Sequence, residues 1–272
     1  MNLPCRAFAV LLLATGLLST VTDRAPAADA KADRPDLTTL LEPRTFTDAE
    51  GDKLPYRLLK PRNYDPTRKY PLVLFLHGAG ERGEDNKAQM IHGVSRFAEA
   101  DSRQEFPCFV VVPQCPKGKR WVEVDWTLDS HRQPAEPSAP MQQTLGLLGA
   151  LQKEFSIDAR RLYVTGLSMG GFGVWDLISR QPTMFAAAVP VCGGGDEMTA
   201  NLLVKTPIWA FHGDKDGVVK VSRSQNMIEA IRKAGGKPRY TEYEGVGHNA
   251  WVRAYQEPDL LKWLFAQNLP ES

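Results

Sequence analysis

The sequence predicts an α/β fold with a mostly parallel central sheet and helices on both of its faces. Short apolar runs, suited to strands buried on both sides, alternate along the chain with helical patterns. Such alternation is typical of βαβ units, and therefore of parallel strands. The 272 residues are 43% hydrophobic and 24% charged, which is the composition of a folded globular protein. Because single α/β domains of about 250 residues are common, we expect one domain.

Residues 1–30 are predicted to be a secretory signal peptide. Arg6 precedes an apolar run over residues 7–18, and small-residue cleavage patterns follow at 25–27 and 28–30. The run is too short to cross about 30 Å of hydrocarbon, although an uncleaved anchor is the alternative. We therefore expect a periplasmic or extracellular protein without stable membrane insertion after cleavage.

Residues 31–44 are polar and are predicted to form a flexible lead-in, followed by a single catalytic domain over residues 45–270. A hairpin is predicted over residues 46–60, with its turn at 50–52. Apolar runs predict buried strands at 71–76, 106–112, 161–165, 185–189 and 207–211, and alternation predicts a strand near the sheet edge at 239–244. Helices are predicted at 141–155, 172–180, 221–234 and 259–268. The Pro-rich stretch 116–140 has no clear periodicity, and long loops of this kind are commonly functional.

The composition also excludes several functions. A net charge of +1 gives no general attraction to phosphate, so no nucleic-acid partner is expected. Cys108, Cys115 and Cys192 would remain after cleavage, and an odd count leaves at least one free thiol. The cysteine spacing and the scattered histidines match no metal-binding pattern, so neither a metal nor another cofactor is expected.

The strongest chemical signal is Gly166-Leu-Ser-Met-Gly-Gly171, which stands between a predicted strand and a predicted helix. A Gly-x-Ser-x-Gly motif in this position is typical of a turn that lifts a nucleophilic serine above the sheet. The sequence therefore predicts that Ser168 is a nucleophile.

A nucleophilic serine requires a base and an orienting acid, which follow it in the chain order serine, acid, histidine in hydrolases with this turn. His212 and His248 are the histidines that follow Ser168, and His212 precedes the candidate acids. His248 is therefore the predicted base. The acid is expected after the strand 207–211, where spacing alone does not distinguish Asp214 from Asp216.

Asp196 and Glu197, which follow the preceding strand, are weaker alternatives for the acid. His77-Gly-Ala-Gly80 follows the first buried strand and is predicted to supply one oxyanion donor, the N–H of Ala79. The N–H of Met169, directly after the nucleophile, is the other predicted donor. We expect His77 to hold this loop rather than take part in the chemistry.

Four further residues are predicted to bind substrate. Trp121 and Trp126 lie in the long loop 116–140, and Trp251 lies three residues after His248. Indole rings can stack on a sugar or phenolic ring, but burial in the core is the alternative for the first two. Arg82 would brace the oxyanion loop through an acid or meet a substrate carboxylate, unless it is a solvated surface charge.

Four segments resemble a known group of proteins: residues 74–83 (LFLHGAGERG), 113–116 (PQCP), 163–172 (YVTGLSMGGF) and 209–219 (WAFHGDKDGVV). They are similar to a bacterial α/β-hydrolase group labelled "predicted peptidase", which borders the prolyl-oligopeptidase catalytic domain and the phospholipase/carboxylesterase family. The resemblance covers about residues 45–268 and implies an α/β-hydrolase fold without a large lid domain. It also implies that Asp216, the second Asp of His-Gly-x-x-Asp, is the acid.

The resemblance and the motifs together predict a secreted serine hydrolase that cleaves carboxylic esters through an acyl-enzyme. The substrate is expected to be a small or polymer-attached ester, for example a feruloyl or acetyl group on a polysaccharide. A serine peptidase acting on short peptides is the first alternative, and a non-catalytic glycan-binding module is the second. The sequence does not indicate an oligomeric state.

Overall fold

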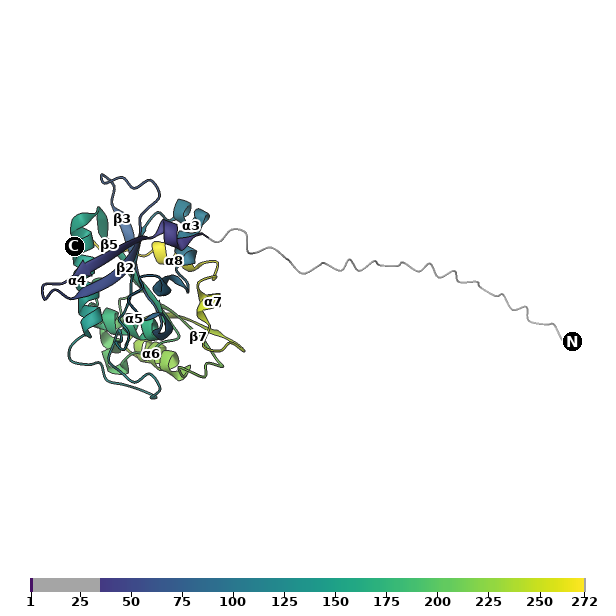
Figure 1. Cartoon of the computed structure of the whole chain (residues 1–272). Coiled ribbons are helices and arrows are strands. Elements are labelled where there is room, and N and C mark those ends of the chain that lie inside the picture. The colour runs from purple at the N-terminus through teal and green to yellow at the C-terminus, as the bar shows by residue number, and fades with distance from the viewer. Residues whose placement is uncertain (2–34, 272) are drawn as a thin grey trace. The chain divides into compact units, whose positions relative to one another are not determined.

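The computed structural model describes Met1 and residues 35–271, and the predicted signal peptide lies outside the described residues apart from Met1. An eight-stranded sheet with the order β1-β2-β4-β3-β5-β6-β7-β8 forms the centre of the molecule (Figure 1). Its strands are β1 (Glu42–Thr47), β2 (Lys53–Leu59), β3 (Tyr70–Leu76), β4 (Phe109–Pro113), β5 (Ile157–Leu167), β6 (Ala187–Val191), β7 (Trp209–Gly213) and β8 (Arg239–Tyr243). β1 and β2 form an antiparallel hairpin, β2 runs antiparallel to β4, and the remaining neighbours are parallel.

Helices cover both faces of the sheet, as predicted. The helices are α1 (Leu37–Leu40), α2 (Ser95–Ala98), α3 (Ala100–Glu105), α4 (Ala139–Glu154), α5 (Met169–Arg180), α6 (Ser222–Lys233), α7 (Trp251–Ala254) and α8 (Leu260–Phe265). Side chains of α4, α5 and α6 pack with Leu72, Leu74 and Leu76 in one core. Side chains of α2, α7 and α8 pack with Val73 and Phe75 in the other. Because successive residues of a strand point to opposite faces, the single apolar run of β3 serves both cores.

The predicted hairpin, the six further strands and the four predicted helices are all present, with ends displaced by a few residues. The flexible lead-in predicted for residues 31–44 is wrong for residues 37–44, which form α1 and the start of β1. Leu41 between them is fully buried, which explains why this segment is held on the domain. Residues 31–34 lie outside the described part of the chain.

The connection between β4 and α4 contains no helix or strand, as predicted for residues 116–140. Over residues 35–271 no lid domain is inserted between strands. None of the helices in the described part of the chain is long and apolar enough to cross a membrane.

The strand order determines where the candidate site lies. Ser168 follows β5, Asp216 follows β7 and His248 lies in the loop after β8, while His77 follows β3. These strands are parallel, so all four residues lie beyond the same edge of the sheet, where ligands bind in open α/β folds.

Candidate active site

Ser168 occupies a strained turn between β5 and α5. Its φ of 54° and ψ of −118° place a non-glycine residue in a sparsely populated conformation, which is held by a 2.9 Å hydrogen bond from Ser168 N to Val191 O. The residue directly precedes the first turn of α5, so its side chain stands at a helix N-terminus. This is the strand–turn–helix geometry that the Gly-x-Ser-x-Gly motif predicts.

The two glycines of the motif are required because β3 passes close to the turn. A Cβ on Gly170 would lie 1.9 Å from Leu76 O, and a Cβ on Gly166 would lie 2.7 Å from the same oxygen. Both distances are far below van der Waals contact, so side chains are excluded at these positions. The glycines therefore allow β3 and the turn to approach each other.

His248 connects the serine to a carboxylate. Its Nε2 lies 2.8 Å from Ser168 Oγ, and its Nδ1 lies 2.7 Å from Asp216 Oδ2. A carboxylate oxygen accepts a hydrogen bond, so Nδ1 carries the proton of the neutral ring and Nε2 accepts from the serine hydroxyl. Ser168, His248 and Asp216 thus form one continuous chain of hydrogen bonds. In this arrangement the imidazole can remove the serine proton.

The carboxylate of Asp216 is buried and fully engaged. Its Oδ1 accepts hydrogen bonds from the backbone N–H groups of Val218 (2.8 Å) and Val219 (2.9 Å). Burial alone would raise the pKa of Asp216. Hydrogen bonds from His212 and His248, together with these two amides, outweigh burial and hold the pKa well below its usual value. Asp216 is therefore ionised at neutral pH.

The structure separates the two aspartates that spacing left open. Asp214 Oδ1 accepts a 2.7 Å hydrogen bond from Gly245 N, and its other oxygen lies 3.6 Å from Lys215 Nζ. Asp214 thus ties the loop after β7 to the loop that carries His248, while Asp216 contacts the imidazole. The weaker alternative Asp196 pairs with Arg132 and caps a 3₁₀ helix.

His77 holds the loop after β3 from within the core. Its Nε2 accepts a 2.9 Å hydrogen bond from Cys115 N, so Nδ1 carries the proton and donates to Gly78 O at 2.6 Å. Burial lowers the pKa of His77 to about 4, against the hydrogen bond to Gly78 and with a small contribution from Arg82. The ring is therefore neutral near pH 7 and acts as a fixed link between two loops.

Ala79 and Met169, the predicted oxyanion donors, lie on neighbouring segments. Met169 is the first residue of α5, where backbone N–H groups have no acceptor within the helix. The loop of Ala79 contacts the turn because Gly78 packs against Leu167, whose Cδ1 lies 3.0 Å from the position of a Gly78 Cβ. Arg82 braces this loop through backbone carbonyls rather than through an acid, with Nε donating to Ala79 O (2.8 Å) and Nη1 to Lys119 O (3.3 Å).

The prediction that Trp121 lines a substrate pocket is wrong. Its side chain has an exposed fraction of 0%, and its Nε1 donates a 3.0 Å hydrogen bond to His77 O. The indole packs against α5 at Gly173, where a Cβ would lie 2.7 Å from Trp121 Cβ. Trp121 therefore supports the loop that carries Ala79 and has no free face for a substrate ring.

The other two tryptophans are only partly buried. Trp126 packs on the core, and the Arg120 guanidinium lies 4.4 Å from the centre of its ring. Trp251 stands edge-on to His248, with ring centres 5.2 Å apart, and also contacts His92 at 5.4 Å. Trp251 is therefore the predicted substrate-binding tryptophan that directly adjoins the triad.

Sequence reasoning missed two further neighbours of the site. His212, which was set aside because it precedes the acid, lies 3.2 Å from Asp216 through its Nε2. His92 precedes Ser168 and is therefore excluded as the base by chain order, yet it contacts Trp251 and lies 3.7 Å from the buried carboxylate of Glu81. The His-Gly-x-x-Asp spacing could have indicated this contact of His212, because a side chain at the end of a strand can reach the loop that directly follows the strand.

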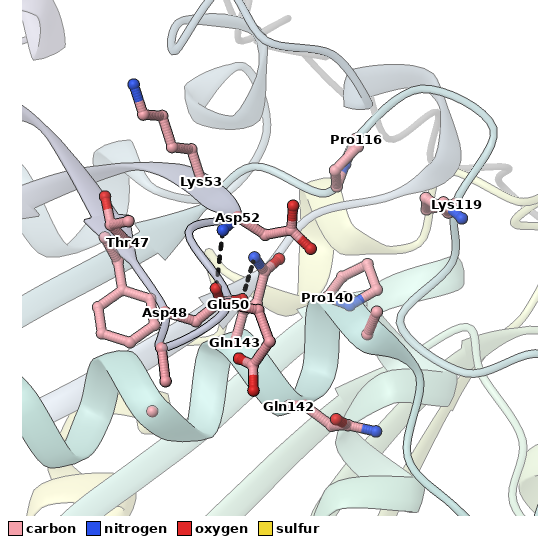
Figure 2. Close-up of a pocket in the computed structure, with 14 residues that line it drawn as sticks. Thr47, Asp48, Glu50, Asp52, Lys53, Pro116, Lys119, Pro140, Gln142 and Gln143 are labelled. Carbon is pink, nitrogen blue, oxygen red and sulfur yellow. Dashed lines mark hydrogen bonds between the residues drawn. The ribbon is translucent and has the colours of Figure 1, made fainter.

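A separate pocket of about 610 Å³ lies between the β1–β2 turn and α4 (Figure 2). Acidic side chains of the turn, including Asp48, Glu50 and Asp52, line it together with Lys119. Figure 2 shows Gln143 of α4 bonded to this turn, and the Gln143 Nε2 to Asp48 Oδ2 distance is 2.9 Å. None of Ser168, Asp216 and His248 lines this pocket.

Cys192, His212 and Asp216 are the group within residues 35–271 whose potential metal-ligating atoms all lie within 4.8 Å of one another. All three side chains are already engaged: Asp216 with His248, His212 with Ser224 Oγ at 2.7 Å, and the Cys192 thiol with His248 O at 3.4 Å. Burial raises the pKa of the Cys192 thiol well above its usual value, so it remains protonated. We therefore describe this group as a hydrogen-bonded cluster behind the triad. Cys108 and Cys115 are also free and buried.

Comparison with known proteins finds similarity to hydrolases. The Dienelactone hydrolase family matches residues 133–259, a range that includes Ser168, Asp216 and His248. A solved structure of a thermostable esterase is 40% identical, with a TM-score of 0.80, and the match covers 85% of this chain and 64% of that one.

Two curated relatives carry esterase names. A bifunctional acetylxylan esterase/xylanase of Neocallimastix patriciarum is 26% identical over 174 residues, covering 63% of this chain and 23% of that protein. A probable carboxylesterase of Oryza sativa subsp. japonica is 25% identical over 193 residues, covering 66% of this chain and 81% of that protein. The chain thus spans about a quarter of the first relative and most of the second. The chain therefore has an α/β-hydrolase fold and is similar to esterases and to the Dienelactone hydrolase family.

Proposed function

We propose that the protein is a serine hydrolase that cleaves carboxylic esters through a Ser168–His248–Asp216 triad. The observation that carries this proposal is the continuous hydrogen-bonded chain from Ser168 Oγ through His248 to Asp216, placed at a strained turn. A buried aspartate that holds an imidazole against a serine hydroxyl is the arrangement that activates the hydroxyl.

The reaction proceeds in two halves. Ser168 Oγ attacks the acyl carbon while His248 Nε2 takes the serine proton, and collapse of the tetrahedral intermediate expels the alcohol, which receives that proton. A water molecule, deprotonated by the same nitrogen, then cleaves the acyl-serine and releases the acid. Asp216 stabilises the imidazolium in both halves, and the N–H groups of Ala79 and Met169 bind the oxyanion.

Replacement of Ser168 by Ala tests the proposal directly. We expect the rate of ester turnover to fall to about 10³ times the uncatalysed rate, with an unchanged melting temperature. Ser179→Ala, which removes a buried hydroxyl further along α5, is the matched control and should keep full turnover. A fluorophosphonate probe should label the wild type at Ser168 and leave the alanine variant unlabelled. Retention of a tenth of wild-type activity by Ser168→Ala would exclude this mechanism.

The ester preference is tested by substrate comparison. The names of the relatives favour ester substrates. The triad alone does not distinguish an esterase from a peptidase, because the same groups can cleave either bond. We expect hydrolysis of p-nitrophenyl acetate and not of aminoacyl-p-nitroanilides; the reverse preference would make the protein a peptidase. Within esters, we propose a polymer-attached acyl group, and a panel that varies acyl and alcohol parts independently measures this.

We also propose that the protein is exported. The proposal rests on the charge, apolar run and cleavage patterns of residues 1–30. Export predicts a mature N-terminus shortly after residue 27 or 30, which N-terminal sequencing of the protein from its own cells would reveal. Recovery of the intact chain from the membrane fraction would instead support an uncleaved anchor.

A further inference from the structure

His212 lies behind Asp216 in a fully buried position at the end of β7. Its Nε2 lies 3.2 Å from Asp216 Oδ2, the oxygen that also accepts from His248 Nδ1. The same Nε2 lies 3.1 Å from the carbonyl oxygen of Val219. One carboxylate oxygen therefore faces two imidazole rings, one from the end of β7 and one from the loop after β8.

The hydrogen-bond partners of His212 determine where its proton lies. A carboxylate and a carbonyl oxygen only accept, so an Nε2 without a proton would face two acceptors in a buried site. Nε2, which faces Val219 O at 3.1 Å and lies in ion-pair contact with Asp216 Oδ2 at 3.2 Å, must therefore carry a hydrogen.

Ser224 controls the other ring nitrogen. Its Oγ lies 2.7 Å from His212 Nδ1 and 2.9 Å from Gly193 O, and its one proton can serve only one of them. If the proton is donated to Nδ1, the His212 ring is neutral; if it is donated to Gly193 O, Nδ1 carries its own proton and the ring is an imidazolium. Nε2 is protonated in both cases, so the donor to Asp216 does not depend on the choice.

We propose that His212 is a positioning residue of the active site, whose Nε2–H fixes the Asp216 carboxylate in line with His248. This inference rests on the proposed function, because it concerns how the triad is held. Two amides fix Asp216 Oδ1, and His212 supplies the fixed donor on Oδ2. Without it, Oδ2 would be oriented by His248 alone, which changes charge during turnover.

The His212 donor beside Asp216 Oδ2 also affects how strongly the Asp216 carboxylate stabilises the His248 imidazolium. The hydrogen bond from His212 is the largest of the contributions that lower the pKa of Asp216. The titratable groups around this carboxylate are His212 from β7, His248 from the loop after β8 and the Cys192 thiol after β6. Removal of the His212 donor would concentrate the carboxylate charge on His248 and make that imidazole more basic.

The first test compares His212→Phe with His212→Gln. Phenylalanine keeps an aromatic ring and removes both nitrogens, whereas the glutamine amide can place an N–H near the position of Nε2. We expect His212→Phe to lower kcat by about tenfold to a hundredfold, the effect of losing one hydrogen bond to a charged group, with KM within about threefold. The acidic limb of its kcat/KM profile should move to higher pH. His212→Gln should recover most of kcat and return the limb toward its wild-type position.

Thr165→Val is the matched control, because it removes a buried hydroxyl that bonds Val189 O in β6 and the Tyr255 hydroxyl at the end of α7. It should lower the melting temperature without moving the acidic limb. If His212→Phe behaves like Thr165→Val, or if His212→Gln is no better than His212→Phe, the positioning role is excluded.

The second test needs no variant to be active. In wild-type protein labelled with ¹⁵N-histidine, the His212 signals are assigned by their loss in His212→Gln. A protonated Nε2 supports the proposal whether or not Nδ1 is also protonated, and a proton on Nδ1 alone overturns it. Because this readout is independent of turnover, it remains decisive if the variants fold but are inactive, and His212→Phe gives the same assignment if His212→Gln does not fold. It also separates failure of this inference from failure of the ester hydrolase proposal, which the Ser168→Ala activity decides.

Discussion

At the residue scale, the candidate site depends on which carboxylate in one short loop meets the imidazole. Asp214 and Asp216 are two residues apart, and both are tied by hydrogen bonds to backbone N–H groups. Only Asp216 also lies within hydrogen-bond distance of His248. Their exchange for asparagine should therefore have very different effects.

Asp216→Asn is expected to lower kcat by about 10⁴-fold, because an amide in place of the carboxylate favours the wrong tautomer of His248. Asp214→Asn keeps a side-chain oxygen that can accept from Gly245 N and should leave kcat within about threefold of wild type. Steady-state ester hydrolysis by the two variants measures this difference. A larger loss in Asp214→Asn would show that the carboxylates have been assigned the wrong way round.

Trp121 and Trp251 provide the second contrast between individual residues. Trp121→Ala removes a fully buried indole and its hydrogen bond to His77 O, so we expect a loss of about 3–5 kcal/mol in unfolding free energy. Activity should fall equally on a small acetate ester and on a bulky aromatic ester.

Trp251→Ala removes a partly exposed ring beside His248 and should cost less stability. Its kcat/KM should fall mainly on the bulky ester, if Trp251 contacts substrate as proposed. Urea unfolding and parallel assays on both esters distinguish the two patterns. A selective loss on the bulky ester in Trp121→Ala would contradict the supporting role given to that residue.

At the scale of elements, the site is produced by close packing of α5 and the Ser168 turn against β3. This approach leaves no room for side chains at the motif glycines, whereas Gly149 in α4 faces open space. Glycine is therefore required where the Ser168 turn and α5 contact β3, and not at helical positions in general.

Gly170→Ala and Gly149→Ala test this requirement with the same substitution in two helices. A Cβ at Gly170 would lie 1.9 Å from Leu76 O, so we expect the variant to fold poorly or to lose its ester activity. Gly149 in α4 has nothing within 4 Å of its Cβ position, and alanine should raise stability by about 0.5–1 kcal/mol. Thermal unfolding of both variants is the measurement. Normal folding and activity of Gly170→Ala would mean that the turn packs less tightly than described.

At the scale of the whole molecule, the sequence predicts the parts that depend on local patterns. The apolar run of β3 and the glycines around Ser168 are constrained by backbone geometry within a few residues, and both were predicted in place. The short helices α2 and α3, of four and six residues, are too brief to show a helical period. The burial of Trp121 depends on α5, which is distant in sequence, so the spacing of tryptophans in the loop could not reveal it.

The global stability should depend on pH, because two histidines are held neutral inside the fold. Burial lowers the pKa of His77 to about 4, and burial with the nearby Arg223 charge lowers the pKa of His131 to about 4 as well. Between pH 6.5 and 4 the unfolded chain binds protons at these residues and the folded chain does not. The free energy of unfolding therefore decreases as the pH falls through this window. Asp216 acts in a different window: its lowered pKa gives stability that is present above about pH 4 and is lost only below it.

His77 should account for up to about 3 kcal/mol of the decrease in unfolding free energy between pH 6.5 and 4, because it is almost completely buried. In His77→Gln the amide offers a donor and an acceptor but does not titrate, so the slope of unfolding free energy against pH should become shallower by this amount. His131→Gln, at a half-buried site, should flatten the slope less. Urea unfolding at intervals across the window gives the three slopes directly. An unchanged slope in His77→Gln would mean that His77 takes up its proton in the folded protein, and the link from Cys115 N to its Nε2 would then have to break near pH 6.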